Sequence, residues 1–327
     1  MGHALRALGS GLRTVITAPA LLMVVTAVSV LSVLPFGLVL GSQLRVALAN
    51  RQPVYLGTAE IDAEWWMAFR EHAEGLAATF TPAILGAAAP LDNLSAMLDG
   101  TGRPLAILGP VLLSALVWAW LWGGLLERFH SARRRGVRAF WQAGWRHVWT
   151  FVAISLAAAV AHLVLYFTVH ALLFGPVFGW LASVAETERT AFFWRIALYG
   201  VFGAFLLAVS MMADFARVSV VVQSRRGVRQ ALTAAATFLR EHAGSAITLY
   251  LLVGVLFAAM LALYVAGEVY GGTRLGGWRS ILIGQGYIVA RLAIRLTLAA
   301  AGVKLYAALQ PGIPHHYIPA AVSSGRV

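Results

Sequence analysis

The chain has 327 residues, of which 60% are hydrophobic and 12% charged, with a formal net charge of +12 at pH 7. Several uncharged runs reach the roughly 18 to 20 residues needed to cross an apolar layer of about 30 Å, which excludes a soluble domain. There is no cysteine, so disulfide bonds, thiolate metal sites and thiol catalysis are excluded. We expect an all-α polytopic membrane bundle, in which the placement of basic residues explains the charge better than nucleic-acid binding does.

Residues 1–41 are predicted to form the first transmembrane span. The run of residues 15–40 has no charged side chain and is interrupted by Pro19 and Pro35. A signal peptide has a similar basic start, but its apolar run is usually only about 7 to 15 residues long. We interpret the run as a retained span whose N-terminus lies inside the cell.

Residues 42–103 are polar enough to lie in water and are predicted to form a periplasmic helical segment. On a helix, Ile61, Trp65 and Phe69 share one face, with Trp66 beside them. Tryptophan at the edge of an amphipathic helix is typical of the headgroup layer. We expect this face either to pack on the ends of the spanning helices or to meet lipid or a protein partner.

Residues 104–309 are predicted to form a bundle of five more spans, with two hairpins at 104–180 and 192–267 and a closing span at 281–309. Both hairpins carry the sequence Arg-Arg-Gly-Val-Arg at their tips, and each tip is followed by a short amphipathic segment. We interpret the hairpins as an internal repeat. The basic residues of the two tips are Arg134, Arg135, Arg138, Arg225, Arg226 and Arg229.

These basic tips allow two interpretations. They either anchor the topology and attract anionic headgroups, or they dock a cytoplasmic partner. In the predicted topology, the inner segments hold 15 basic and three acidic residues, and the outer segments hold eight basic and ten acidic residues. The positive-inside rule then predicts a bacterial inner-membrane protein with both termini in the cytoplasm, including the tail of residues 310–327.

The closing span carries Arg291 and Arg295, which share one helix face because they are four residues apart. A guanidinium near mid-membrane costs about 3 kcal/mol on insertion scales, so it must pair, snorkel or face water. We expect Arg295 to reach toward Asp214 or Glu127, the acids that end the incoming spans of the hairpins. Arg291 would meet backbone carbonyls, Gln285 or a lipid phosphate. The two arginines are either internal ties or part of a substrate or lipid site.

The sequence contains no recognisable catalytic, phosphate-binding or metal-binding motif. His162 and His170 lie eight residues apart in the third span, but no other span offers a mid-membrane histidine as a second haem ligand. We therefore predict polar packing for both, with no cofactor, no metal and no catalytic residue.

The hairpins and the closing span, with its sequence Gln-Gly-Tyr-Ile-Val-Ala-Arg-Leu-Ala-Ile-Arg at residues 285–295, resemble a broad group of six-helix bacterial membrane proteins of unknown function. The same region is similar to the membrane domain fused to some glycerophosphodiester phosphodiesterases. The resemblance covers roughly residues 104–309 and implies a six-helix fold but no activity, since no phosphodiesterase domain follows the closing span.

The function predicted from these features is non-enzymatic. The protein would act as a membrane scaffold, a complex subunit or a lipid-associated factor, with anionic membrane lipids and a membrane or periplasmic protein as partners. The alternative is a transporter or permease subunit in which Arg291 and Arg295 line an anion or lipid path.

Overall fold

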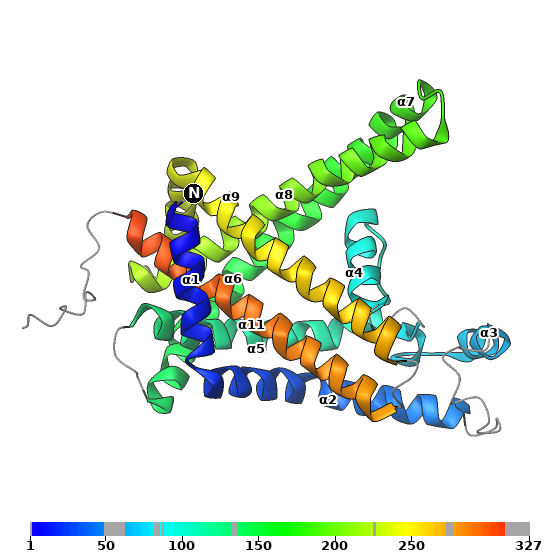
Figure 1. Cartoon of the computed structure of the whole chain (residues 1–327), viewed down its shortest axis with the longest axis horizontal. Coiled ribbons are helices and arrows are strands. Elements are labelled where there is room, and N and C mark those ends of the chain that lie inside the picture. The colour runs from blue at the N-terminus through cyan, green and yellow to red at the C-terminus, as the bar shows by residue number, and fades with distance from the viewer. Residues whose placement is uncertain are drawn as a thin grey trace, which may run out of the picture.

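The computed structural model describes residues 2–48, 63–81, 86, 88–131, 136–224, 227–272 and 277–310. These residues form helices and no strand, which confirms the predicted all-α class (Figure 1). Among them, six helical stretches are long and apolar enough to cross a membrane: Pro19–Ala47, Leu105–His130, Val137–Ser183, Glu188–Val222, Val228–Tyr270 and Ile281–Leu309. The protein is therefore a multi-pass integral membrane protein.

The chain begins with a separate helix, α1 (Gly2–Ile16), which was not expected from the sequence. A turn at Thr17 and Ala18 joins it to α2 (Pro19–Leu48). Proline is well accommodated at the start of a helix, because its missing N–H would have no partner there and its φ is already helical. The first span thus begins at Pro19 rather than at residue 15, and it continues through Pro35.

Two short helices follow α2, namely α3 (Ala63–His72) and α4 (Ala88–Asp99). A 3-10 turn, η2 (Ala77–Thr79), lies between α3 and α4, and a second, η4 (Leu105–Ile107), lies between α4 and the next span. No side chain of α4 is fully buried, so its position depends on contacts at its ends.

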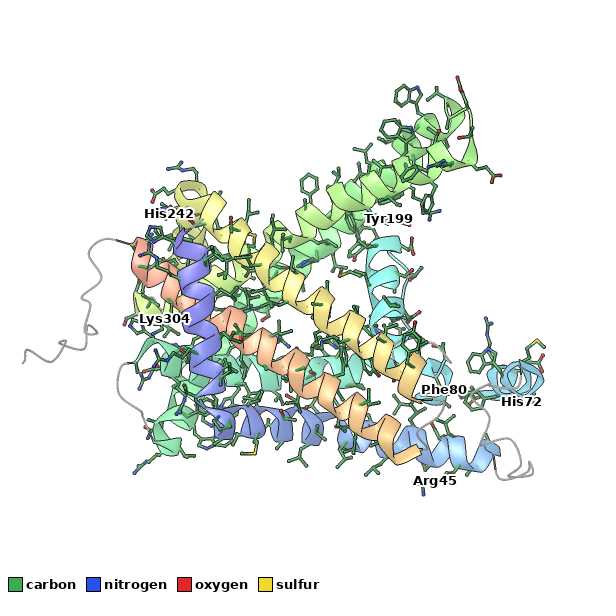
Figure 2. The ribbon with its side chains drawn as sticks, in the orientation of Figure 1. Arg45, His72, Phe80, Tyr199, His242 and Lys304 are labelled. Atoms are coloured by element: carbon green, nitrogen blue, oxygen red, sulfur yellow. The ribbon has the colours of Figure 1, made fainter. Side chains whose placement is uncertain are left out.

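The aromatic face predicted for this segment packs on a spanning helix. Phe69 and Phe80 are buried, and the rings of both lie within about 6 Å of the Trp66 ring. The cluster rests on the end of α2, where its neighbours are Leu40, Leu44 and Ala47; Phe80 is labelled in Figure 2. Of the two interpretations given above, packing on the bundle accounts for Trp66 and Phe69. Ile61 and the side chain of Trp65 lie outside the described residues.

The remaining helices form two hairpins and a closing helix. α5 (Leu108–His130) is followed by α6 (Val137–Leu165), which continues through two π-helical turns, η5 (Tyr166–His170) and η6 (Leu173–Val177), into α7 (Phe178–Ser183). α8 (Glu188–Val222) and α9 (Val228–Gly267) form the second hairpin, and the π-helical turn η7 (Glu268–Gly272) precedes α11 (Gly277–Leu309).

α9 has a kink at His242, where the backbone leaves the helical region. This residue separates the N-terminal arm of α9, which follows the second basic tip, from the apolar span. The two hairpins share this general plan, but the internal repeat stays a prediction.

The buried core gathers at one end of the bundle, which we call the basic end. It comprises α1, the ends of α5, α8 and α11, and the starts of α6 and α9, with basic residues Arg6, Arg13, Arg128, Arg138, Arg146, Arg229 and Arg240. α8 has 35 residues and so extends about 52 Å at 1.5 Å per residue, more than the roughly 30 Å apolar layer. In its last turns, Phe215, Ala216 and all residues from Val218 to Val222 are buried. At the opposite end, α7 and the start of α8 diverge from α9 and α11 (Figure 1).

α5 and α6 approach each other closely at glycine. A Cβ atom on Gly123 would lie 2.8 Å from the Ala143 carbonyl oxygen, and one on Gly144 would lie 2.6 Å from the Trp120 ring nitrogen. Small residues allow such backbone contacts between membrane helices, where burial of apolar groups gives little drive for association. Gly123 and Gly144 lie within continuous helices, at the point where α5 and α6 cross closely.

We predict that Gly123→Ala lowers the stability of the protein in detergent by roughly 1 to 3 kcal/mol, because the new methyl group meets rigid backbone. Thermal unfolding followed by tryptophan fluorescence measures this. Gly203→Ala is the matched control, since a Cβ atom there has no neighbour within 4 Å and alanine favours the helix. Equal melting temperatures for the two variants would contradict the close crossing.

Candidate functional site

α11 is the central helix of the bundle and carries the two intramembrane arginines. It contacts α1, α2, α5, α8 and α9. Of the residues in the most apolar stretch of α11, 50% are buried. In the corresponding stretches of the other five described spans, only 6% to 28% of the residues are buried. A side chain on α11 is thus positioned relative to most of the fold.

Arg295 lies over two tryptophan rings of α5. Its guanidinium carbon is 3.8 Å from the centre of the Trp118 ring and 5.5 Å from that of Trp122. Such cation–π contacts are worth roughly 0.5 to 2 kcal/mol, more when water is excluded. They hold the plane of the guanidinium and leave its N–H groups free to bind in that plane.

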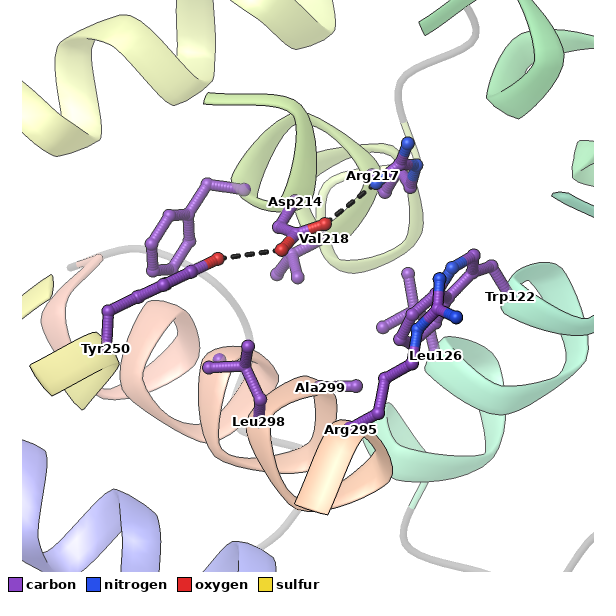
Figure 3. Close-up of a pocket in the computed structure, with 11 residues that line it drawn as sticks. Trp122, Leu126, Asp214, Arg217, Val218, Tyr250, Arg295, Leu298 and Ala299 are labelled. Carbon is purple, nitrogen blue, oxygen red and sulfur yellow. Dashed lines mark hydrogen bonds and ion pairs between the residues drawn. The ribbon is translucent and has the colours of Figure 1, made fainter. Parts of the chain in front are cut away.

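Asp214 of α8 accepts two strong hydrogen bonds. Arg217 Nη1 lies 2.7 Å from Asp214 Oδ1, and the Tyr250 hydroxyl of α9 donates to Asp214 Oδ2 at 2.8 Å (Figure 3). Arg217 also donates to Ser155 Oγ on α6 at 3.1 Å. Through these bonds the charge of Asp214 is compensated and α6, α8 and α9 are tied together.

Arg295 and Asp214 line the same cavity. Its volume is about 140 Å³, and its walls come from α5, α8, α9 and α11 (Figure 3). Within the described part of the chain, however, no carboxylate lies within 4 Å of Arg295. Arg295 and Asp214 thus line one cavity, but it is Arg217 that forms the ion pair with Asp214.

Glu127 lies in a second site at the basic end. Its carboxylate is 3.3 Å from His147 Nε2 and 3.5 Å from Arg146 Nη1, so it bonds across the first hairpin, as Asp214 does across the second. A cavity of about 650 Å³ is lined by Glu127, Arg146, His147 and Ser224 among others. Arg295 is not among the residues that line it.

The other predicted residues are dispersed. Arg291 and Gln285 are exposed on α11, closer to the opposite end, and neither lines the cavity of Arg295. Arg138 and Arg229 are exposed at the starts of α6 and α9. Arg134, Arg135, Arg225 and Arg226 lie outside the described residues. In the part of the chain that the structure describes, no group of three or more histidine, aspartate or glutamate residues could hold a metal ion.

His170 helps to hold α4 at the opposite end. Its Nε2 donates to the Leu98 carbonyl at 3.0 Å, and the Tyr166 hydroxyl donates to the Met97 carbonyl at 2.6 Å. These two side chains satisfy carbonyls that have no partner inside a helix end. His162 donates from Nδ1 to the Ala158 carbonyl of its own helix.

Asp99, the last residue of α4, completes this contact. It accepts a short hydrogen bond from the Tyr199 hydroxyl of α8 and another from Ser95, and Arg195 lies 3.5 Å away. Figure 2 shows Tyr199 beside the end of α4. The hydrogen bond from Tyr199, followed by that from Ser95, holds the pKa of Asp99 below its usual value, with smaller contributions from Arg195 and His170.

Several residues of these sites were not anticipated from the sequence, namely Trp118, Trp122, Ser155, Arg217 and Tyr250. Local pattern offers a weak signal for some of them, because Trp118 and Trp122 are four residues apart and share a face, as do Asp214 and Arg217 three apart. Ser155 and Tyr250 carry no such signal, since they reach the site only through the packing of other helices.

No protein family, curated protein or solved structure matches the chain. The similarity to the membrane domain of some glycerophosphodiester phosphodiesterases therefore stays a prediction.

We predict that Asp214→Asn lowers the free energy of unfolding by roughly 1 to 3 kcal/mol, because it removes the charge partner of a guanidinium that is only 14% exposed. Chemical unfolding in detergent measures the loss. Glu186→Gln, at an exposed position outside this network, should leave stability unchanged. Stability equal to that of Glu186→Gln would show that Arg217 does not need Asp214.

We predict that acid releases α4 from α8. Because the folded-state pKa of Asp99 is lowered, its contribution is fully present above the unfolded value of about 3.9 and is lost as the pH falls through the lower folded value. The natural chain has no cysteine, so a spin label can be attached at Leu94→Cys alone. This label should become mobile as the pH falls through the folded-state pKa of Asp99. Tyr199→Phe should move release to higher pH, whereas Tyr270→Phe, at an 81% exposed residue, should not. Label mobility that is independent of both pH and Tyr199 would contradict the prediction.

Proposed function

We propose that this protein is a non-enzymatic, lipid-associated protein of the bacterial inner membrane that holds the phosphate of an anionic lipid headgroup against Arg295. In this proposal, the basic end and both termini lie in the cytoplasm, in accord with the positive-inside rule. The observation that carries the proposal is the combination of a fixed guanidinium and a cavity whose one lining carboxylate among the described residues, Asp214, already has a partner.

The charges around the cavity favour an anion. Its lining contains two arginines, Arg217 and Arg295, and one acid, Asp214, so the balance of formal charges is +1. Arg217 is engaged by Asp214, which leaves Arg295 as the group available to an incoming anion. A guanidinium suits phosphate particularly well, because it offers parallel N–H donors to two oxygens.

The size and location of the cavity favour a headgroup over a soluble substrate. A volume of about 140 Å³ exceeds the roughly 10 to 15 Å³ that a cavity needs to hold one water molecule, but it lies well below the roughly 300 to 1,000 Å³ of ordinary ligand pockets. Arg295 is exposed at the surface of the bundle, so a lipid could bring its phosphate to the guanidinium while its chains stay in the bilayer.

Arg291 extends the positive charge along the same face of α11. It is exposed one turn away from Arg295, and a long side chain at such a position can bend toward the membrane surface. We assign to it a supporting electrostatic role in attracting the lipid. The transporter alternative uses the same two arginines, and it requires that the bound anion also leave on the other side.

The test is the lipid content of the protein purified in mild detergent. We predict that Arg295→Gln reduces the phosphatidylglycerol that co-purifies by about fivefold or more, which corresponds to about 1 kcal/mol per arginine near an anionic surface. Mass spectrometry of protein and lipid measures the ratio. Arg189→Gln, an exposed arginine at the opposite end, is the matched control. An unchanged ratio for Arg295→Gln would refute the proposal.

Further measurements distinguish a bound lipid from a free anion, a transporter and a scaffold. Thermal stabilisation by short-chain phosphatidylglycerol, but not by phosphatidylcholine or inorganic phosphate, would identify a lipid rather than a free anion. Anion or lipid flux in vesicles that depends on Arg295 would instead favour the transporter. Stoichiometric protein partners without Arg295-dependent lipid would favour the scaffold.

A further inference from the structure

α1 has an exposed apolar sector that nothing in the described structure covers. Leu5, Leu12 and Ile16 are 50%, 44% and 67% exposed, whereas the buried residues of the helix, Ala4, Ala7, Gly11 and Val15, occupy another face. Large apolar side chains at such exposure are unfavourable in water, because the hydrophobic effect scales with the apolar area left in contact with it. We therefore expect this sector to be in contact with an apolar environment.

The buried face fixes α1 on α11. A Cβ atom on Gly11 would lie 2.8 Å from both the Ala301 nitrogen and the Thr297 carbonyl oxygen. Contacts with α9 and α2 add to this one. Figure 1 shows that α1 crosses α11 instead of running along it and meets α2 at a sharp bend. The helix is thus held across the direction of the spans.

The connection to α2 sets the depth of α1. Only Thr17 and Ala18 separate Ile16 from Pro19, the first residue of a spanning helix. The end of α1 is therefore at the level where the chain enters the membrane. A helix that begins at this level and crosses the spans lies along the membrane surface.

The charged residues of α1 indicate which lipids that membrane surface contains. α1 contains no acidic residue, and its arginines, Arg6 and Arg13, directly follow Leu5 and Leu12 in the sequence. Successive residues are about 100° apart on a helix of 3.6 residues per turn, so the basic sector borders the apolar one. With the leucines in the acyl region, both guanidinium groups reach the phosphate level, as in helices that lie in the membrane interface.

We infer that α1 is an in-plane membrane helix that binds the anionic headgroup layer through Arg6 and Arg13, with Leu5, Leu12 and Ile16 inserted below it. This surface is separate from the cavity of Arg295, and the inference does not depend on the function proposed above. It assigns an interaction to a helix whose residues were predicted to be part of the first span.

The natural chain has no cysteine, so single cysteines can be placed freely for spin labelling. The full-length protein would carry a label at Leu5, Leu12 or Ser10 and would be reconstituted in phosphatidylcholine vesicles with or without phosphatidylglycerol. Accessibility to oxygen reports the acyl region, and accessibility to a water-soluble nickel chelate on both sides reports water. Leu263→Cys, at a residue 75% exposed in the span of α9, gives the lipid reference.

The expected result is a several-fold higher ratio of oxygen to nickel accessibility at Leu5 and Leu12 than at Ser10. The ratio should rise when phosphatidylglycerol is present. This rise should be lost in the double variant Arg6→Gln and Arg13→Gln, but retained in the matched control Arg70→Gln and Arg189→Gln, which changes two exposed arginines at the opposite end.

Three outcomes would overturn the inference. Equal access of nickel to Leu12 and Ser10 would place the helix in water. Protection of Leu12 from both reagents would show a protein contact on this sector. A ratio that is indifferent to phosphatidylglycerol and to the two arginines would show insertion without recognition of anionic headgroups. Because α1 packs through its small residues, these surface variants should keep the fold, which the melting temperature checks.

Discussion

Lipid solvates apolar helix faces about as well as protein does, so helices within a membrane associate through close backbone approach and polar contacts. Close backbone approach is seen at the basic end of this protein, whereas polar contacts occur at both ends. Gly11 brings α1 onto α11, and Gly123 and Gly144 bring α5 onto α6. The outer half of α8 packs differently: Phe202 is buried against the rings of Tyr166 and His170, while the Cβ positions of Gly200 and Gly203 have no neighbour within 4 Å. The position of the core thus follows from where small residues meet.

Hydrogen bonds and ion pairs between polar side chains also join the helices. Asp214 ties α8 to α9 through Tyr250 and, through Arg217, to α6. At the other end, Asp99 and His170 hold α4, a helix with no fully buried side chain. The same chemistry that stabilises the bundle leaves one guanidinium, that of Arg295, stacked on tryptophan without a carboxylate partner within 4 Å among the described residues. A positive group fixed in this way is suited to a ligand.

Some residues of the candidate site could be predicted from sequence patterns, and others could not. Arg291 and Arg295 were identified because charge inside an apolar run is expensive, and Asp214 was named as a partner because acids near span ends are few. Arg295 and Asp214 line one cavity. The choice of Arg217 as the actual ion-pair partner was not foreseen, although it lies one helical turn from Asp214. Trp118 was missed because a cation–π contact requires the angle at which α5 and α11 cross, and no local sequence pattern contains that angle.

The helical class, the six spans and the basic character of one end could be predicted from the amino-acid sequence. These properties depend on hydrophobicity and charge along the chain, which act on each segment separately. The tertiary structure alone decided that residues 2–16 form a helix across the bundle, that the aromatic face of Phe69 rests on α2, and that Arg295, Asp214 and Tyr250 share a cavity. Those outcomes depend on contacts between segments far apart in the chain, where close packing and directional hydrogen bonds select one arrangement among many that satisfy the same hydrophobic pattern.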